Sequence, residues 1–165
     1  KPKGVELEHR SVVNFLLASA SLLALRPREV CAAVTTICFD IAVLELFLPL
    51  TTGGSVCVLP RSVVTDGPCL VNALTDLNPT LFQATPSLYA ILLESGWAGL
   101  PAARALVGGE PLPPPLASRL IPKVGSLWNM YGPTEATVWC TAQVITPALA
   151  VRPPIGKPYP NTTAY

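Results

Sequence analysis

The sequence predicts an α/β fold: a largely parallel sheet with crossover helices. Short β-branched or apolar runs alternate along the chain with stretches that suit helices, which is the order found in β-α-β units. These runs are apolar on both of the faces that a strand would present, as expected when helices cover both sides of a sheet. Half of the 165 residues are apolar and only 13% are charged, so much of the chain must be buried. This length suits one domain with a hydrophobic core.

The first expected element is a helix over residues 11–25, where apolar residues recur at helical spacing and Ser11 is placed as the N-cap. Strands and helices then alternate. The predicted strands cover residues 30–35, 55–59, 80–84, 105–108 and 126–130. The predicted helices cover residues 41–50, 68–77, 87–95 and 114–121. The prolines of residues 152–160 predict an irregular connector that leaves the sheet, and we expect residues 1–165 to be a partial domain core, truncated at both ends.

Composition argues against several classes of function. The net charge is +1 and the basic residues are scattered, so neither nucleic acid nor an acidic membrane surface is expected as a partner. Five cysteines without a C-x-x-C pair, and a single histidine, disfavour a metal-thiolate site and predict a reducing, cytoplasmic location. Residues 30–50 are apolar, but Asp40 and Glu45 lie near the middle, where an acid opposes membrane insertion by about 2.5–3.5 kcal/mol. We therefore expect a strand followed by a helix there.

The polar residues of this apolar chain gather in loops that follow the predicted strands. Ligands of open α/β sheets bind beyond the carboxyl ends of the strands, which places the site in these loops. The loops cover residues 36–40, 83–87, 108–112 and 131–137.

The strongest motif covers residues 129–135, Asn-Met-Tyr-Gly-Pro-Thr-Glu. A Gly-Pro turn directly after a strand presents the aromatic ring of Tyr131, the hydroxyl of Thr134 and the carboxylate of Glu135 close together. These groups could stack on a base, donate to a phosphate and bind Mg²⁺ through oxygen. Residue chemistry alone leaves a second interpretation open, a common strand-to-loop turn with a packed tyrosine and a solvated glutamate.

The motif resembles the diagnostic segment of adenylate-forming enzymes, the superfamily of amino-acid adenylation domains, acyl-CoA synthetases and luciferases. Further segments match that superfamily in the same order: residues 1–4, the tail of a phosphate-binding loop, then residues 8–14, 39–43, 108–112 and 154–158. Ala42 departs from the pattern, which usually has a small hydroxyl residue there. The set spans nearly the whole chain, which is identified as a fragment of an amino-acid adenylation domain of a nonribosomal peptide synthetase.

The resemblance implies a role for each matching residue. The adenine would lie between Tyr131 and residues 108–110, while Thr134 would contact phosphate and Glu135 would bind Mg²⁺, these last two acting as the catalytic residues. The nucleotide-binding set implied in this way is Lys3, Gly108, Gly109, Glu110, Asn129, Tyr131, Gly132 and Thr134.

Asp40 has two interpretations. It could cap the helix predicted over residues 41–50, since Asp is a favoured N-cap. Alternatively, it could pair with the α-ammonium group of an amino-acid substrate, because a buried carboxylate needs a partner. The resemblance favours the second interpretation and the amino-acid branch of the superfamily.

The resemblance also implies which residues line the substrate side-chain pocket. They are Asp40, Ile41, Leu44, Gln83, Leu106, Gly108, Met130, Val138 and Trp139. Asp40 is the charged member of this set, and its bulky members leave little space for a substrate side chain. The lining is similar to that of glycine-selecting domains, so glycine is the expected substrate, with alanine or another small neutral residue second.

The implied chemistry uses ATP and Mg²⁺, and the implied partners are peptidyl carrier and condensation domains, the carrier bearing phosphopantetheine. We expect residues 1–165 alone to be inactive. Two alternatives stay open: an acyl-CoA or aryl-CoA ligase of the same superfamily, and a non-catalytic nucleotide-binding fragment.

Overall fold

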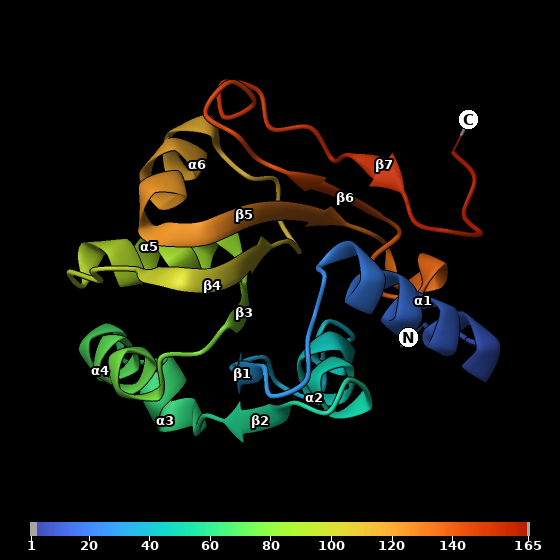
Figure 1. The fold of residues 1–165 in the computed structure, drawn as a ribbon, viewed down its shortest axis with the longest axis horizontal. Coiled ribbons are helices and arrows are strands. Elements are labelled where there is room, and N and C mark those ends of the chain that lie inside the picture. Colours follow the sequence, from blue (N-terminus) through green and yellow to red (C-terminus); the bar gives the residue numbers. More distant parts are fainter. Residues whose placement is uncertain (1–2, 165) are drawn as a thin grey trace.

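In the computed structural model, which describes residues 3–164, seven strands form one sheet in the order β2-β1-β3-β4-β5-β6-β7, with β2 at the bottom of the view and β6 and β7 at the top (Figure 1). Strands β1 to β5 are mutually parallel, and β6 and β7 continue the sheet in antiparallel fashion. The strands are β1 (Val30–Ala33), β2 (Ser55–Val58), β3 (Leu81–Ala84), β4 (Leu100–Val107), β5 (Val124–Tyr131), β6 (Thr141–Val144) and β7 (Lys157–Pro158). The predicted fold class, α/β with a largely parallel sheet, is confirmed.

Crossover helices connect the parallel strands, as the sequence predicted. The helices are α1 (His9–Leu22), α2 (Ala42–Thr51), α3 (Arg61–Val64), α4 (Gly67–Leu77), α5 (Pro86–Glu94) and α6 (Pro114–Leu120), with 3-10 turns η1 (Ile121–Lys123) and η2 (Thr134–Ala136). Asp66 caps α4 by accepting from the Cys69 amide at 2.9 Å, and Thr85 caps α5 by accepting from the Leu88 amide at 3.3 Å.

The structure differs from the sequence-based predictions in several local details. Helix α1 begins at His9, with Glu8 as its N-cap and no capping side chain, so Ser11 is not the cap. The short helix α3 was not predicted. Residues 157–158 do not leave the sheet, because Lys157 and Pro158 pair with Ala142 and Thr141 of β6. Proline lacks an amide donor, but β7 is an edge strand, where that donor is not needed.

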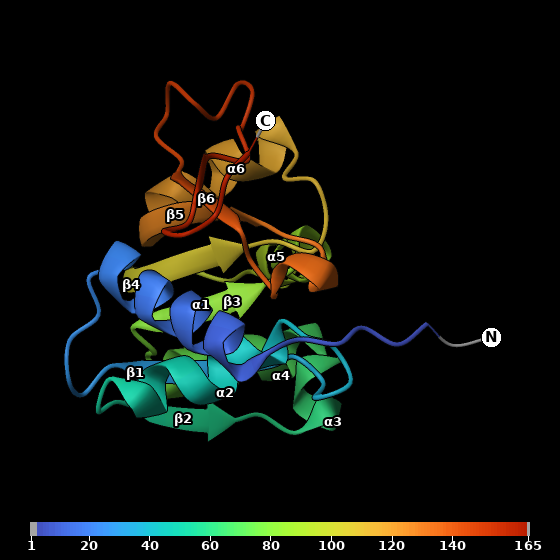
Figure 2. The same ribbon diagram turned by 90° about the vertical axis from the view of Figure 1, so that its right-hand side faces the viewer.

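Two hydrophobic cores lie on the two faces of the sheet, and neighbouring strand residues point into different ones. Leu81 belongs to the core under α1 and α2, whereas Phe82 belongs to the core under α4, α5 and α6. Figure 2 shows α1 and α2 in front of the sheet, with α4, α5 and α6 farther back. Burial on both faces explains why the strands are apolar without alternation.

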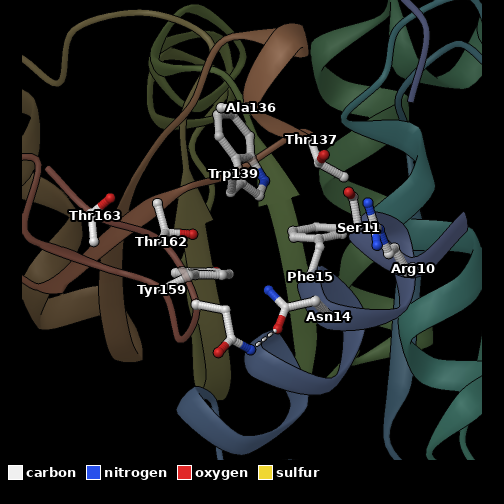
Figure 3. Close-up of a pocket in the computed structure, with 11 residues that line it drawn as sticks. Arg10, Ser11, Asn14, Phe15, Ala136, Thr137, Trp139, Tyr159, Thr162 and Thr163 are labelled. Carbon is white, nitrogen blue, oxygen red and sulfur yellow. Dashed lines mark hydrogen bonds between the residues drawn. The ribbon is translucent and has the colours of Figure 1, made fainter. Parts of the chain in front are cut away.

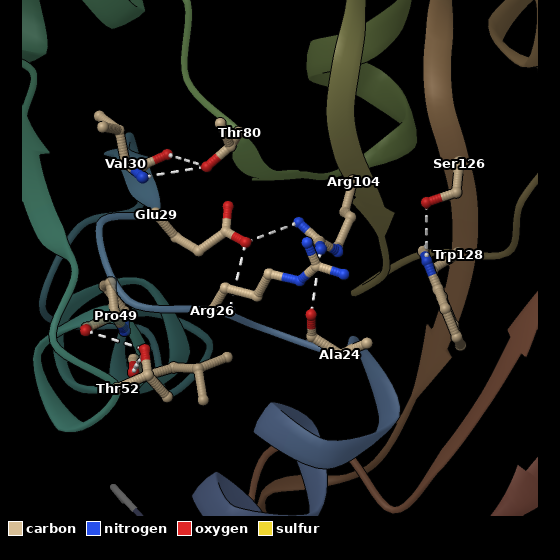
Figure 4. Close-up of polar contacts among 11 residues, drawn as sticks. Ala24, Arg26, Glu29, Val30, Pro49, Thr52, Thr80, Arg104, Ser126 and Trp128 are labelled. Carbon is tan, nitrogen blue, oxygen red and sulfur yellow. Dashed lines mark hydrogen bonds and ion pairs between the residues drawn. The ribbon is translucent and has the colours of Figure 1, made fainter.

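An ion pair ties the segment before β1 to strand β4. The Arg104 Nη1 atom donates to Glu29 Oε1 at 3.1 Å, and its Nη2 atom donates to the carbonyl of Ala24 at 3.1 Å (Figure 4). The Arg26 amide donates to the same Glu29 oxygen at 3.3 Å. Glu29 is buried and immediately precedes β1, so this contact lies at the amino end of the strands, away from the loops that were predicted to form the site.

Within residues 3–164, none of the helices has both the length and the apolar character that crossing a membrane requires.

Candidate nucleotide and substrate site

The loops that follow β4 and β5 enclose a cavity of about 330 Å³ at the carboxyl ends of the strands. Many of the residues predicted to bind nucleotide lie around it, together with residues from the segment before β7. The cavity is lined by Gly109, Glu110, Pro111, Leu112, Asn129, Met130, Tyr131, Gly132, Trp139, Pro153 and Ile155. The Tyr131 side chain is about half exposed at 48% and therefore leaves an aromatic face accessible. This cavity has the composition that a nucleotide base needs, an aromatic surface beside backbone polar groups.

Two glycines allow the backbone to form this cavity. Gly109 has φ +82°, in the left-handed region that glycine adopts without strain. At Gly132 the limit is space, since a Cβ atom would lie 2.5 Å from the carbonyl oxygen of Val138. The chain can therefore turn back after β5, and the Cys140 amide donates to the Tyr131 carbonyl at 2.9 Å.

Asn129 positions the opposite wall of the cavity. Its side-chain amide donates to the carbonyl of Pro154 at 2.9 Å, and the Thr141 hydroxyl donates to the carbonyl of Ile155 at 2.7 Å. These bonds hold residues 153–155 against the end of β5. The sequence indicated a motif at residues 154–158, but not that Pro153 and Ile155 would line the cavity.

Lys3 and Glu135 form an ion pair with each other, so two residues predicted for the phosphate and metal end lie together. Both are exposed; the Lys3 ammonium lowers the pKa of Glu135, and the Glu135 carboxylate raises the pKa of Lys3. Thr134 is the first residue of η2, next to Glu135. Residues 1 and 2 of the predicted phosphate-loop tail lie outside the described residues.

Glu135 could bind Mg²⁺ only if ligands from outside the chain, such as phosphates and water, complete the coordination. Glu135 offers ionised carboxylate oxygens, which are suitable ligands. No group of three or more acidic, cysteine or histidine side chains in residues 3–164 could hold a metal ion. Mg²⁺ commonly binds through one or two carboxylates together with substrate phosphates and water, and the single carboxylate here matches that mode.

The residues predicted for the substrate pocket come from five separate segments and meet on the α1–α2 face of the sheet. Ile41, Leu44, Leu106, Met130, Val138 and Trp139 belong to one buried cluster, and Gln83 and Gly108 are also buried. Gln83 is 0% exposed, yet its amide is satisfied. Its Nε2 atom donates to the Ile41 carbonyl at 2.9 Å and to Glu45 at 3.0 Å, and its Oε1 atom accepts from Trp139 at 2.9 Å.

The Trp139 indole fills the space that the absent Gly108 side chain leaves. A Cβ atom built on Gly108 would lie 2.5 Å from Trp139 Cη2 and 2.8 Å from the Met130 carbonyl oxygen. The indole is therefore held on one side by the Gly108 backbone and on the other by its hydrogen bond to Gln83. Both contacts fill space among the residues that were predicted to line the substrate pocket.

Asp40 is half-buried at the end of the loop that follows β1. The helix-cap interpretation is wrong, because α2 begins at Ala42 with Ile41 as its N-cap and has no capping side chain. Within residues 3–164 the Asp40 carboxylate takes part in no hydrogen bond or ion pair. It lies one residue before Ile41, at the edge of the predicted pocket.

Glu45 is the residue that the sequence interpretation missed. It appeared only as an acid that argued against a membrane span, yet it is 0% exposed and accepts a hydrogen bond from Gln83. An acidic residue inside an apolar helix was the available signal, because such a residue needs buried partners.

A second cavity, of about 540 Å³, lies between α1 and the chain around β6 and β7 (Figure 3). Phe15 and Tyr159 stack across it with ring centroids 6.2 Å apart, and the Asn161 amide donates to Asn14 Oδ1 at 2.7 Å. Trp139 lines this cavity as well as the first one.

Comparison with known proteins agrees with this geometry. The profile of the family described as "AMP-binding enzyme" matches residues 1–165. The "Dimodular nonribosomal peptide synthase" of Bacillus subtilis (strain 168) is 38% identical over 165 residues, which are 100% of this chain and 7% of that protein. The "PKS-NRPS hybrid synthetase ATPKS" of Aspergillus niger is 36% identical over 166 residues, which cover 100% of this chain and 9% of that protein.

Among solved structures, holo-AB3403, a four-domain nonribosomal peptide synthetase bound to AMP and glycine, has a TM-score of 0.93 and 46% identity. The match covers 96% of this chain and 12% of that chain. This chain thus spans between 7% and 12% of the length of these three relatives. It belongs to the AMP-binding enzyme family, as part of an adenylation domain of the kind that nonribosomal peptide synthetases contain.

Proposed function

We propose that the parent protein uses ATP to activate glycine, or another small neutral amino acid, as the aminoacyl-AMP. The observation that carries this proposal is the buried Trp139 indole, which is hydrogen-bonded to Gln83 and packed against Gly108. A side chain larger than a methyl group would have to displace that indole from a close-packed site. The activated amino acid would then pass to the phosphopantetheine thiol of a carrier domain, next to a condensation domain.

In this proposal the 330 Å³ cavity holds the adenosine part of ATP. Tyr131 would stack on the adenine, and the backbone of Gly109 and Glu110 would lie at its other face. Gly132 and Asn129 would shape the cavity, and Lys3 and Thr134 would contact phosphate oxygens. The exposure of Tyr131 and the left-handed backbone at Gly109 support this arrangement.

The reaction would be an in-line displacement at the α-phosphorus. A carboxylate oxygen of the amino acid forms the new P–O bond, and pyrophosphate leaves with the electrons of the bond that breaks. The chain would contribute by positioning the two reactants and by neutralising charge. Mg²⁺ bound through Glu135 would supply positive charge at the phosphates. Lys3, now paired with Glu135, would turn toward the phosphates when the metal takes its place.

Asp40 would bind the α-ammonium group of the substrate. Its carboxylate is half-buried, is not used as a helix cap and lies beside the pocket residue Ile41. A cationic substrate group would supply the partner that a partly buried carboxylate needs. The similarity to holo-AB3403, whose structure was solved with AMP and glycine bound, supports a small substrate.

The test is amino-acid-dependent ATP–pyrophosphate exchange by the full-length parent protein, with a panel of amino acids and simple acids. We expect the highest kcat/KM with glycine, and a loss of about 100-fold or more in Asp40→Ala, because an unpaired ammonium would be left in the site. Asp76→Ala, which removes an exposed carboxylate from α4, is the matched control and should exchange like the wild type.

Other outcomes would reject the proposal. Exchange with simple acids alone, unaffected by Asp40→Ala, would instead identify an acyl-CoA or aryl-CoA ligase. Nucleotide binding without exchange for any acid would identify a non-catalytic nucleotide-binding protein.

A further inference from the structure

Glu45 lies in the first turn of α2, inside the core that this helix forms with the sheet, and is completely buried. Its Oε2 atom accepts from the amides of Val34 and Thr35, both at 2.9 Å. Its Oε1 atom accepts from the Thr35 hydroxyl at 2.6 Å and from Gln83 Nε2 at 3.0 Å. Burial raises the pKa of this carboxyl, and the hydrogen bonds that it accepts oppose the shift.

All of these neighbours act as donors, which is the pattern of a carboxylate rather than of a carboxylic acid or an amide. A glutamine at this position would carry an NH₂ group in place of one oxygen. That group would face either two backbone N–H groups or the NH₂ group of Gln83. The four hydrogen bonds are all satisfied only when both side-chain atoms of residue 45 are acceptors, as the two oxygens of a carboxylate are. The negative charge of the carboxylate strengthens these bonds.

The acceptor at Glu45 determines which way the Gln83 amide points. With the Gln83 NH₂ group directed at Glu45 and at the Ile41 carbonyl, the Gln83 oxygen faces the opposite direction. There it accepts from the indole N–H of Trp139 at 2.9 Å. Reversal of this amide would place two donors, Nε2 and the indole N–H, against each other. The chain of hydrogen bonds therefore has one direction, from Trp139 through Gln83 to Glu45.

The same carboxylate also holds the loop that carries Asp40. Val34 and Thr35 are the first residues after β1, and their amides are bound to Glu45 before the loop continues through residues 36–40. Glu45 thus connects the segment proposed to bind the substrate ammonium group with the side chains proposed to limit substrate size.

We propose that Glu45 is a positioning residue that sets the size of the substrate pocket without lining it, by holding the Gln83 amide in the orientation that retains the Trp139 indole. This inference rests on the proposed function, amino-acid activation at the same pocket. Loss of the acceptor at Glu45 should release the indole, and the pocket should then admit a larger side chain.

The test is Glu45→Gln in the full-length parent protein, compared with wild type in ATP–pyrophosphate exchange with glycine and with alanine. We expect the ratio of kcat/KM for glycine to that for alanine to fall about fivefold or more, the size expected when a buried hydrogen bond is disturbed. The change should lie in the KM values of the amino acids, with the KM for ATP unchanged. Trp139→Phe should lower the ratio as well, and the double variant should lower it no further, because both changes break one chain of contacts.

A second measurement reports on Trp139 itself and needs no substrate. In protein that contains 5-fluorotryptophan, the ¹⁹F resonance of residue 139 can be identified by its absence in Trp139→Phe. We expect Glu45→Gln to move that resonance. The matched control is Glu29→Gln, which alters another buried carboxylate at the opposite end of the strands. It should lower stability while both the resonance and the substrate ratio stay as in wild type.

The outcomes separate this inference from the proposed function. If Glu45→Gln slows exchange equally for glycine and alanine and leaves the resonance in place, Glu45 is merely structural and the inference is overturned. The wild type could instead exchange fastest with an amino acid other than glycine. If Glu45→Gln still moves the ¹⁹F resonance and Glu29→Gln does not, the glycine proposal fails and the positioning role of Glu45 stands. Should Glu45→Gln not fold, Thr35→Val removes only the hydroxyl donor to Oε1; an unchanged resonance and ratio in that variant would overturn the inference.

Discussion

The indole of Trp139 occupies the position where any side chain at residue 108 would have to lie, with Cη2 2.5 Å from the Cβ atom that Gly108 lacks. Two residues 31 positions apart in the sequence thus share a single volume. The pairing links the identity of a glycine in one loop to the rotamer of a tryptophan in another.

Gly108→Ala should therefore be destabilising. The added methyl group would contact both the indole and the Met130 carbonyl, and the latter belongs to the backbone of a central strand and cannot easily move. We expect a loss of about 1–3 kcal/mol in the free energy of unfolding, typical of overpacking. Urea denaturation would measure it, with Gly4→Ala as control because no atom lies within 4 Å of its Cβ position. Equal stability of the two variants would contradict the close packing at Gly108.

Trp139→Ala should enlarge the predicted substrate pocket. Trp139 lines both the 330 Å³ cavity and the 540 Å³ cavity, so we expect removal of its indole to add space beside each of them. We expect exchange activity with larger apolar amino acids to rise at least about tenfold relative to glycine, because buried apolar surface would then favour them by about 1–3 kcal/mol. Trp128→Ala, which removes a partly buried indole from the same face, should leave the preference unaltered. An unchanged substrate preference in Trp139→Ala would show that this indole does not limit substrate size.

Arg104→Met should destabilise the fold without affecting the site. It leaves the buried Glu29 carboxylate without its cation, at a cost of about 2–3 kcal/mol, below the range for fully buried pairs because the Arg104 side chain is partly exposed. Chemical denaturation of the parent protein would measure this loss. The double variant Arg104→Met, Glu29→Leu should recover much of it, since no unpaired charge remains. A double variant no more stable than Arg104→Met would argue against the unpaired charge as the cause.

Tyr159 should make stability depend on alkaline pH. Burial raises the pKa of its hydroxyl from 10.0 to about 12 in the folded protein, so the folded state favours the neutral phenol. The resulting stabilisation is fully present below pH 10 and is lost as the pH rises through the folded pKa of about 12. Its size is about 1–3 kcal/mol, because each unit of pKa shift corresponds to about 1.4 kcal/mol.

Tyr159→Phe removes this titration and keeps the ring that stacks on Phe15. Between pH 10 and pH 12 the wild type should lose more unfolding free energy than this variant, as measured by denaturation at several pH values. The other buried titrating groups, such as Tyr89 and Cys31, are the same in both proteins and cancel in the comparison. Parallel stability curves for the two proteins would contradict a raised pKa at Tyr159.

Several parts of the fold were predictable because their signals are local. The apolar runs at β1, β3 and β5 and the helical stretches between them lie where the sequence placed them, within a few residues. Strand β6 was missed although it is as long as β1 and β3, and β7 has only two residues, one of them a proline. Their pairing depends on β5 as a template, and no residue within them signals that contact.

The sequence by itself determined the α/β class and the order in which strands and helices follow one another along the chain. It also determined the motif after β5 and the edge of the sheet where the candidate site lies. These features could be predicted because hydrophobic periodicity and turn residues act over a few positions. Only the tertiary structure decided how the pocket residues contact one another. Glu45 became a hydrogen-bond acceptor for Gln83, 38 positions away, and Gln83 became the acceptor for Trp139, 56 positions away. Bonds between buried polar groups so far apart in the chain depend on strand order and register, which bring their atoms within about 3 Å only after the sheet has formed.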